Sequence, residues 1–123
     1  MQKPVTTVLP DAATLANLAA ETLSDKLATD IVLLDLSKQM AFTDFFVIGT
    51  GDNERHVRAL RDAVEDSFTA VGVEPLHVEG TADSGWVLMD YVSVVVHLFS
   101  PELRSYYRLE ELWGKAAPLV HFA

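Results

Sequence analysis

Two short apolar runs that lie only three residues apart constrain this chain more than any other feature: Trp86–Asp90 and Val94–Phe99. Both are rich in β-branched, aromatic or other large apolar residues, a composition typical of strands, so they predict an antiparallel hairpin. We place the turn at Tyr91–Val92, which predicts three cross-strand pairs: Trp86 with His97, Leu88 with Val95, and Asp90 with Ser93. Because Val92 is β-branched and resists positive φ, we do not expect a tight primed turn.

The two faces of this hairpin differ in composition, because side chains alternate along a strand. One face is aliphatic and is predicted to be core: Val87, Met89, Val94, Val96 and Leu98. The other face mixes aromatic, aliphatic and polar side chains: Trp86, Leu88, Asp90, Val95, His97 and Phe99. Such a mixture is typical of interface hot spots, so we expect a partner to bind there. The alternative is that the C-terminal helical segment covers this face with Tyr106, Tyr107, Leu109 and Trp113.

The remaining elements follow from periodicity and from capping residues. Apolar positions at helical spacing follow Asp11, which caps a first helix, and a second such pattern extends from Val57 to Val71. Ser100 caps a last helix that continues to Trp113. Three further apolar runs predict strands: Ile31–Leu36, Phe45–Gly49 and Leu76–Glu79.

The resulting order of elements, α-β-β-α-β-β-β-α, predicts an α/β fold in which helices flank a mixed sheet. A chain of 123 residues is the right length for a single domain. We expect residues 1–10 to be a flexible lead-in, residues 11–114 to form the domain, and residues 115–123 to be a C-terminal tail.

The chain is acidic, with 18 acidic and 9 basic residues and a formal net charge of −9. Such a charge repels phosphate, so we expect no extensive direct binding to nucleic acid and favour a basic protein partner. The absence of cysteine excludes disulfides, zinc–thiolate sites and thiol nucleophiles. The longest apolar stretch, Val92–Phe99, is too short to span a membrane. No signal or transit pattern is evident, so we expect a cytoplasmic protein.

The segment Gly49-Thr50-Gly51 precedes the second helix, where a phosphate could bind at the helix N-terminus. A dinucleotide fingerprint needs a third glycine where Glu54 stands, and a P-loop needs a Lys-Ser/Thr pair that is absent. Asp52 and Glu54 also place negative charge where the phosphate would lie. We interpret the segment as a structural turn, with phosphate binding as the alternative.

No catalytic or metal-binding constellation is evident. Metal-dependent phosphoryl transfer needs paired carboxylates, and the one such spacing, Asp52 with Glu54, stands at a helix start. The four histidines have neither the spacing of a metal pair nor a nucleophile elbow beside them: His56, His77, His97 and His121. We therefore expect no metal, no cofactor and no enzymatic activity. His97, inside an apolar strand, is either a buried sheet histidine or a partner contact.

Three groups of residues match a known pattern in order and spacing. The first is Thr43–Ile48, Thr50-Gly51 and Arg55–Arg58; the second is Val78–Gly80, Trp86–Tyr91 and Val95–His97. The third is Arg104, Tyr107, Leu109, Glu110 and Leu112-Trp113. Over about Leu15 to Trp113 the chain resembles the ribosomal silencing factor (Iojap-like) family. It departs from the family pattern at Asp52–Glu54 and at Val92-Ser93, which replaces a Gly-Asp turn.

The resemblance implies a nucleotidyltransferase-like fold that lacks the metal carboxylates of the enzymes. It also implies a homodimer that binds ribosomal large-subunit protein L-fourteen, blocks joining of the small subunit and represses translation during starvation. Trp86 and Asp90 match family positions associated with the ribosomal contact. The resemblance and the mixed hairpin face together give the residues that we expect to bind the partner: Trp86, Leu88, Asp90, Tyr91, His97, Phe99, Arg104, Tyr107 and Trp113. The alternatives are a nucleotidyltransferase-type enzyme and a nucleotide-binding or dimerising adaptor.

Overall fold

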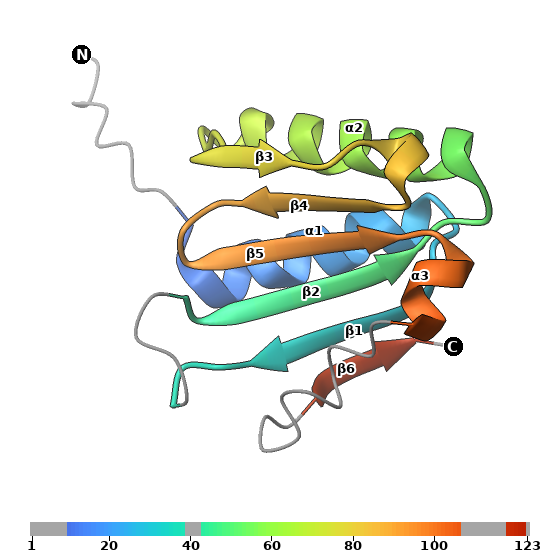
Figure 1. Ribbon diagram of the computed structural model, residues 1–123. Helices are drawn as coiled ribbons and strands as arrows, with labels where there is room; N and C mark the ends of the chain where they lie inside the picture. The colour runs from blue at the N-terminus through green and yellow to red at the C-terminus, as the bar shows by residue number, and fades with distance from the viewer. Residues whose placement is uncertain (1–9, 39–42, 107–117, 123) are drawn as a thin grey trace, which may run out of the picture.

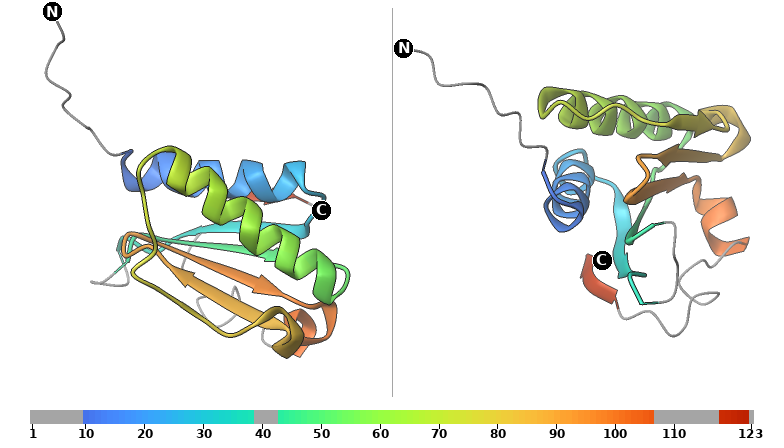
Figure 2. Two further views of the ribbon diagram at one scale, coloured as in Figure 1. Left: turned by 90° about the horizontal axis from the view of Figure 1, so that it is seen from above. Right: turned by 90° about the vertical axis from the view of Figure 1, so that its left-hand side faces the viewer.

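A six-stranded sheet with the strand order β3-β4-β5-β2-β1-β6 forms the centre of the protein. Helices α1 (Ala12–Asp25) and α2 (Glu54–Ala70) cover one side of the sheet, and the short helix α3 (Pro101–Tyr106) lies on the other side (Figures 1 and 2). The computed structural model describes residues 10–38, 43–106 and 118–122. The strands are β1 (Thr29–Asp35), β2 (Phe45–Thr50), β3 (His77–Glu79), β4 (Trp86–Asp90), β5 (Val94–Phe99) and β6 (Pro118–Phe122), and the 3-10 helix η1 (Ala82–Ser84) precedes β4.

Strands β2 and β5 pair in parallel at the centre of the sheet, and the other four strand pairs are antiparallel. The predicted α/β fold, a mixed sheet with flanking helices, is confirmed. Strand β6 lies in the segment predicted as a tail, residues 115–123, yet its backbone pairs with β1. The sheet therefore extends past the predicted end of the domain. The predicted last helix begins as expected, and its residues 107–113 lie outside the described residues.

The hairpin of β4 and β5 has a register two residues away from the predicted one. Trp86 pairs with Phe99, Leu88 with His97 and Asp90 with Val95. The N–H of Tyr91 donates to the carbonyl of Val94 at 2.9 Å, so the loop is Val92–Ser93 and not Tyr91–Val92. A shift of two residues returns each side chain to the same side of the sheet. The predicted pairs are therefore wrong, whereas the predicted division into two faces is confirmed.

The turn itself is tighter than we predicted. Val92 has a φ of 72°, a conformation that is strained for a β-branched residue. Two short hydrogen bonds close the loop around it: Asp90 Oδ1 accepts from the N–H of Val92 at 2.8 Å, and the N–H of Ser93 donates to Tyr91 at 2.9 Å. The pairing of the strands and these local bonds together hold Val92 in the conformation that its side chain disfavours.

The core is divided by the sheet into two apolar clusters. The larger cluster lies between the sheet and helices α1 and α2, and includes most of the predicted apolar stripe of α2 and the aliphatic face of the hairpin: Val57, Leu60, Val64, Phe68, Val87, Met89, Val94, Val96 and Leu98. Val71, the last residue of the predicted stripe, follows the end of α2 and is exposed. The smaller cluster lies on the other side of the sheet: Val32, Leu34, Leu36, Phe46, Ile48, Val95 and Phe99. Burial of such side chains supplies the main favourable term in folding.

Helices α1 and α2 end in the same backbone motif with different residues in the left-handed position. The N–H groups of Leu27 and Ala28 donate to carbonyls of the last turn of α1, and those of Gly72 and Val73 do the same after α2. The left-handed residue is Leu27 in the first case, with φ 66°, and Gly72 in the second, with φ 83°. Leucine lacks the conformational freedom that glycine has in this position.

We predict that Leu27→Gly raises the free energy of unfolding by up to about 1 kcal/mol, because it relieves left-handed strain of about 1–2 kcal/mol at some cost in chain entropy. Leu27 is 77% exposed, so the substitution removes little burial. The reciprocal change, Gly72→Leu, is expected to lower the free energy by about 1–2 kcal/mol. Urea denaturation of both variants measures the effect. A loss of stability in Leu27→Gly would contradict the prediction.

Candidate partner-docking face

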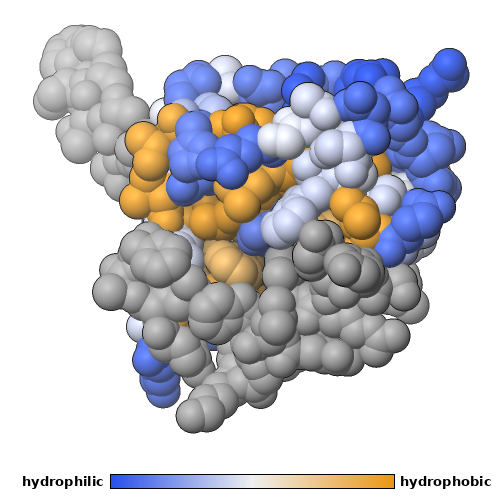
Figure 3. Space-filling model, viewed as in Figure 1, coloured by the Kyte–Doolittle hydropathy of each residue, from blue (hydrophilic) through white to orange (hydrophobic). Residues whose placement is uncertain are grey.

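The side of β4 and β5 that faces away from α1 and α2 is the candidate site, and we call it the docking face. It carries the mixed set of side chains predicted from the hairpin: Trp86, Leu88, Asp90, Val95, His97 and Phe99. Figure 3 shows this side of the molecule, on which hydrophobic residues gather over part of the sheet between hydrophilic ones. The structure therefore brings five of the nine predicted partner-binding residues together on one surface, with Val95 beside them.

The two strands contribute to the docking face in different ways. Along β4, Trp86, Leu88 and Asp90 are half-buried, while the side chains between them are fully buried in the core. The β5 residues of this face, with His97 and Phe99 among them, are buried. Strand β4 therefore supplies the accessible groups, and β5 supplies the floor beneath them.

Trp86 is held by two aromatic neighbours from β5. Its indole Nε1–H donates to Nδ1 of His97 at 3.2 Å. The indole also stacks on the ring of Phe99, with ring centroids 5.1 Å apart and planes at 28°. His97 in turn contacts the edge of Phe46, with ring centroids 4.6 Å apart. The indole therefore has a defined orientation while part of its surface stays accessible.

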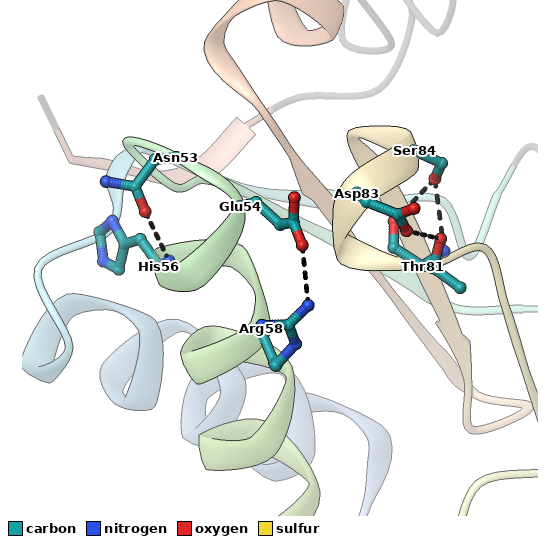
Figure 4. Close-up of polar contacts among 7 residues, drawn as sticks. All are labelled: Asn53, Glu54, His56, Arg58, Thr81, Asp83 and Ser84. Carbon is teal, nitrogen blue, oxygen red and sulfur yellow. Dashed lines mark hydrogen bonds and ion pairs between the residues drawn. The ribbon is translucent and has the colours of Figure 1, made fainter.

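The backbone before β4 also fixes the position of Trp86. Gly80 has a φ of 82°, and a Cβ atom there would lie 2.1 Å from the carbonyl oxygen of Trp86. No side chain fits in that space. Ser84 Oγ donates to the same carbonyl at 3.1 Å, and Thr81 and Asp83 are hydrogen-bonded to each other through their side chains (Figure 4). These contacts fix the turn from which Trp86 emerges.

Two hollows on the docking face share Leu88 in their lining. The first, which we call the Trp86 hollow, has a volume of about 320 Å³ and is lined by Glu79, Gly80, Ser84, Trp86, Leu88 and Leu103. The second, the His97 hollow, has a volume of about 410 Å³ and includes in its lining Phe46, Leu76, Leu88, Val95 and His97. Leu88 and Glu79 line both hollows. Concave apolar surfaces of this kind receive the anchoring side chains of partners.

A row of polar groups borders the hollows along β3 and β4. His77 Nε2 hydrogen-bonds to Glu79 Oε2 at 3.0 Å, and its Nδ1 lies 3.7 Å from Asp90 Oδ2. Asp90 Oδ1 meanwhile accepts from the N–H of Val92 in the turn. The docking face therefore combines an apolar centre with an acidic border.

Sequence reasoning missed His77 and Glu79 as members of this surface. Both belong to β3, where His77 pairs with Asp90 and Glu79 pairs with Leu88. Paired residues share a side of the sheet, so the alternation that assigned the β4 residues would also have assigned these two.

Tyr91 and Arg104, which we had included among the partner-binding residues, lie elsewhere. Tyr91 is buried in the larger core cluster with its ring 4.3 Å from that of Phe68, and burial raises the pKa of its hydroxyl. Arg104 is buried and donates from Nε to Asp30 Oδ2 at 3.0 Å, which ties α3 to β1. Both have structural contacts in place of a position on the docking face. The remaining two predicted residues, Tyr107 and Trp113, lie outside the described residues.

The glycine-rich turn before α2 uses its own groups where a phosphate would bind. The N–H of Gly51 donates to the carbonyl of Phe99 at 2.9 Å, and the N–H of Asp52 donates to Nδ1 of His56 at 2.8 Å. Asn53 caps α2 by accepting from the N–H of His56 at 2.9 Å (Figure 4). These bonds leave fewer backbone donors for an anion, as the interpretation of a structural turn requires.

Within residues 10–38, 43–106 and 118–122, no three histidine, aspartate or glutamate side chains are arranged to hold a metal ion. None of the helices in this described part is long and apolar enough to cross a membrane.

Comparison with known proteins identifies relatives of this chain. The family model described as "Ribosomal silencing factor during starvation" matches residues 9–122. The chain belongs to the ribosomal silencing factor family. The resemblance seen in the sequence is thereby confirmed, and the family's role is regulatory.

Several bacterial and organellar proteins are similar along most of this chain. The ribosomal silencing factor RsfS of Chromobacterium violaceum is 38% identical over 104 residues, which cover 85% of each chain. That of Bacillus subtilis is 37% identical over 102 residues, covering 83% of this chain and 86% of the relative. The mouse protein "Mitochondrial assembly of ribosomal large subunit protein 1" is 34% identical over 70% of this chain and 39% of its own length.

Solved structures of the family share the fold. A crystal structure of a protein from Chromobacterium violaceum superposes with a TM-score of 0.81 at 36% identity, covering 93% of this chain and 97% of the other. A crystal structure from Bacillus halodurans gives a TM-score of 0.74 at 36% identity, covering 82% and 94%.

His97 predicts a specific dependence of stability on pH. Burial, and secondly the charge of Arg104, lowers the pKa of His97 from 6.5 to about 4. The unfolded chain therefore takes up a proton at this residue first as the pH falls. The contribution of His97 to the free energy of unfolding is complete above about pH 6.5. As the pH falls from 6.5 to about 4, the free energy of unfolding decreases by about 3 kcal/mol in total because of this residue.

We predict that His97→Phe, which has no titrating group, loses less stability than the wild type between about pH 7 and pH 4.5. Urea unfolding of both proteins across this range gives the two slopes. The other histidines are common to both proteins, so their contributions cancel. Identical slopes would contradict the prediction, whatever the absolute stability of the variant.

Proposed function

We propose that this member of the silencing factor family represses translation by binding the large ribosomal subunit with its docking face. The proposed contact is ribosomal protein L-fourteen, and the bound domain would occupy space that the small subunit needs in order to join. The observation that carries the proposal is the row Trp86, Leu88 and Asp90, which is half-buried and borders two hollows. The name of the mouse relative, which refers to the large subunit, supports the same partner.

The chemistry of the docking face suits a protein partner with a basic surface. Trp86 and Leu88 present large apolar groups next to concave surface, which is the makeup of an interface hot spot. Glu79 and Asp90 border them, and the chain as a whole carries a net charge of −9. Complementary charge accelerates association and sets orientation, while buried apolar anchors supply most of the binding free energy.

The mechanism that we propose is steric and needs no reaction. A domain with a rigid sheet surface can be placed firmly on one subunit, and its bulk then excludes the other. No residue of the docking face is required to transfer a group or to activate water. This is consistent with a regulatory family and with the non-enzymatic role that we expect.

We predict that Trp86→Ala weakens binding to isolated large subunits about thirtyfold or more and that Leu88→Ala weakens it about tenfold, because each removes an anchoring group. Sedimentation of the protein with large subunits measures the affinity, and a subunit-joining assay measures the loss of inhibition. Asp90→Asn removes the negative charge, but its amide oxygen can still accept from the N–H of Val92. This variant therefore measures what the charge contributes to binding without disrupting the turn.

Two control variants accompany these. Val78→Ala changes an exposed side chain of β3 that pairs with Met89 and so lies on the opposite side of the sheet, and its binding should be unchanged. Val96→Ala opens the core on that side and should lower the free energy of unfolding by about 1–3 kcal/mol without affecting the docking face. A folded Trp86→Ala protein that binds large subunits normally would exclude this face as the contact.

The non-enzymatic proposal makes its own prediction about nucleotides. Because the turn before α2 uses its backbone donors internally, ATP or GTP with magnesium should bind no more tightly than about 1 mM, or about −4 kcal/mol. Isothermal titration calorimetry measures this. Micromolar, magnesium-dependent binding would favour the alternative of a nucleotidyltransferase-type enzyme.

Homodimer formation stays a prediction from the family resemblance, and a cytoplasmic location stays a prediction from the sequence pattern. Sedimentation velocity at several concentrations tests the first. The docking-face variants should be included in this measurement, because a residue that binds only the partner need not change self-association.

A further inference from the structure

The Trp86 hollow has a more specific chemistry than the docking face as a whole. Its wall includes the indole of Trp86, the aliphatic side chains of Leu88 and Leu103, and the carboxylate of Glu79. The side chain of Glu79 is 67% exposed and uses Oε2 for its hydrogen bond with His77. Its second carboxylate oxygen has no hydrogen-bond partner among the described residues. An aromatic surface, an apolar floor and an outward-facing carboxylate thus meet in one hollow of about 320 Å³.

We propose that the Trp86 hollow receives an arginine side chain of the basic partner. This inference rests on the proposed function, since it names the group that the partner presents to the docking face. The planar guanidinium can lie against the indole, and its N–H groups can donate to the carboxylate of Glu79. The methylene stem of arginine packs on Leu88 and Leu103, as the stems of long cationic side chains do on apolar surfaces.

Arginine fits these features better than lysine does. The guanidinium is planar and weakly hydrated, so it can stack on an aromatic face and bind a carboxylate at the same time. Lysine presents a compact, strongly hydrated charge that would have to shed more of its water in the hollow. The combination of Trp86 and Glu79 in one wall therefore selects for the guanidinium.

The same features disfavour two other occupants. A phosphate of ribosomal RNA would meet the carboxylates of Glu79 and Asp90 at the border of the face. A second copy of this chain docked through the same face would bring the carboxylates of Glu79 and Asp90 toward an identical acidic border, which opposes close approach at this hollow. The charge of the hollow and the charge of the whole chain favour a cation.

The first experiment compares two charge reversals in the full chain. Glu79→Lys should weaken binding to isolated large subunits about tenfold or more, because it removes a charge-assisted contact and adds a repulsive one. Glu21→Lys makes the same chemical change at an exposed position of α1, on the other side of the sheet, and should change the affinity by less than about twofold. Equal losses would mean that only net charge matters, and would overturn the inference.

The second experiment uses small probes and needs no ribosome. A blocked Gly-Arg-Gly peptide should shift the NMR signals of Glu79, Leu88 and the Trp86 indole, whereas its isosteric citrulline peptide should not. Glu79→Gln should abolish the difference between the two peptides. Shifts caused equally by both peptides, or caused instead by adenosine monophosphate, would overturn the inference.

The two proposals can fail separately. If Trp86→Ala and Leu88→Ala abolish subunit binding but Glu79→Lys does not, the docking face stands and the arginine contact is wrong. If Trp86→Ala and Leu88→Ala leave binding intact, the proposed function fails first, whatever the peptides do.

Discussion

The parallel pairing of β2 with β5 is the constraint on which the rest of the structure depends. Two parallel neighbours cannot be joined by a tight turn, so the chain leaves β2, forms α2 and adds the β3–β4 strands before it returns as β5. Helix α2 lies beside α1 on one side of the sheet, which the larger core cluster fills. Among the described helices, only the short α3 lies on the opposite side (Figure 2). The topology thus leaves part of the β4–β5 surface accessible to a partner.

Much of this arrangement was predictable from sequence because it depends on local periodicity. The alternation in Trp86–Asp90 and Val94–Phe99 identified both strands with their observed bounds, and the two faces of the hairpin were assigned correctly. The apolar stripe of α2 from Val57 to Phe68 was equally plain in the sequence. These features need only the geometry of a strand or helix and the preference of apolar side chains for burial.

The errors arose where one local preference was outweighed by bonds between elements. The β-branched side chain of Val92 argued against positive φ, yet pairing of the two strands and the carboxylate of Asp90 hold it there. Tyr91 was grouped with the docking residues because of its place in a motif, and the structure puts it in the core against Phe68. The hollows beside Leu88 could not be predicted, because they depend on how β3, β4 and α3 meet in space.

The hydrogen bond from Trp86 to His97 has a consequence for how fast and how tightly a partner can bind. An exposed tryptophan commonly samples several rotamers, and association then has to select one at an entropic cost of about 0.5–1.5 kcal/mol per side chain. Here the indole is already fixed by its bond to Nδ1 of His97 and by stacking on Phe99. Its polar N–H is also satisfied from within, so a partner need not supply an acceptor for it. The indole is therefore preorganised: most of its ordering has taken place during folding, before any encounter with a partner.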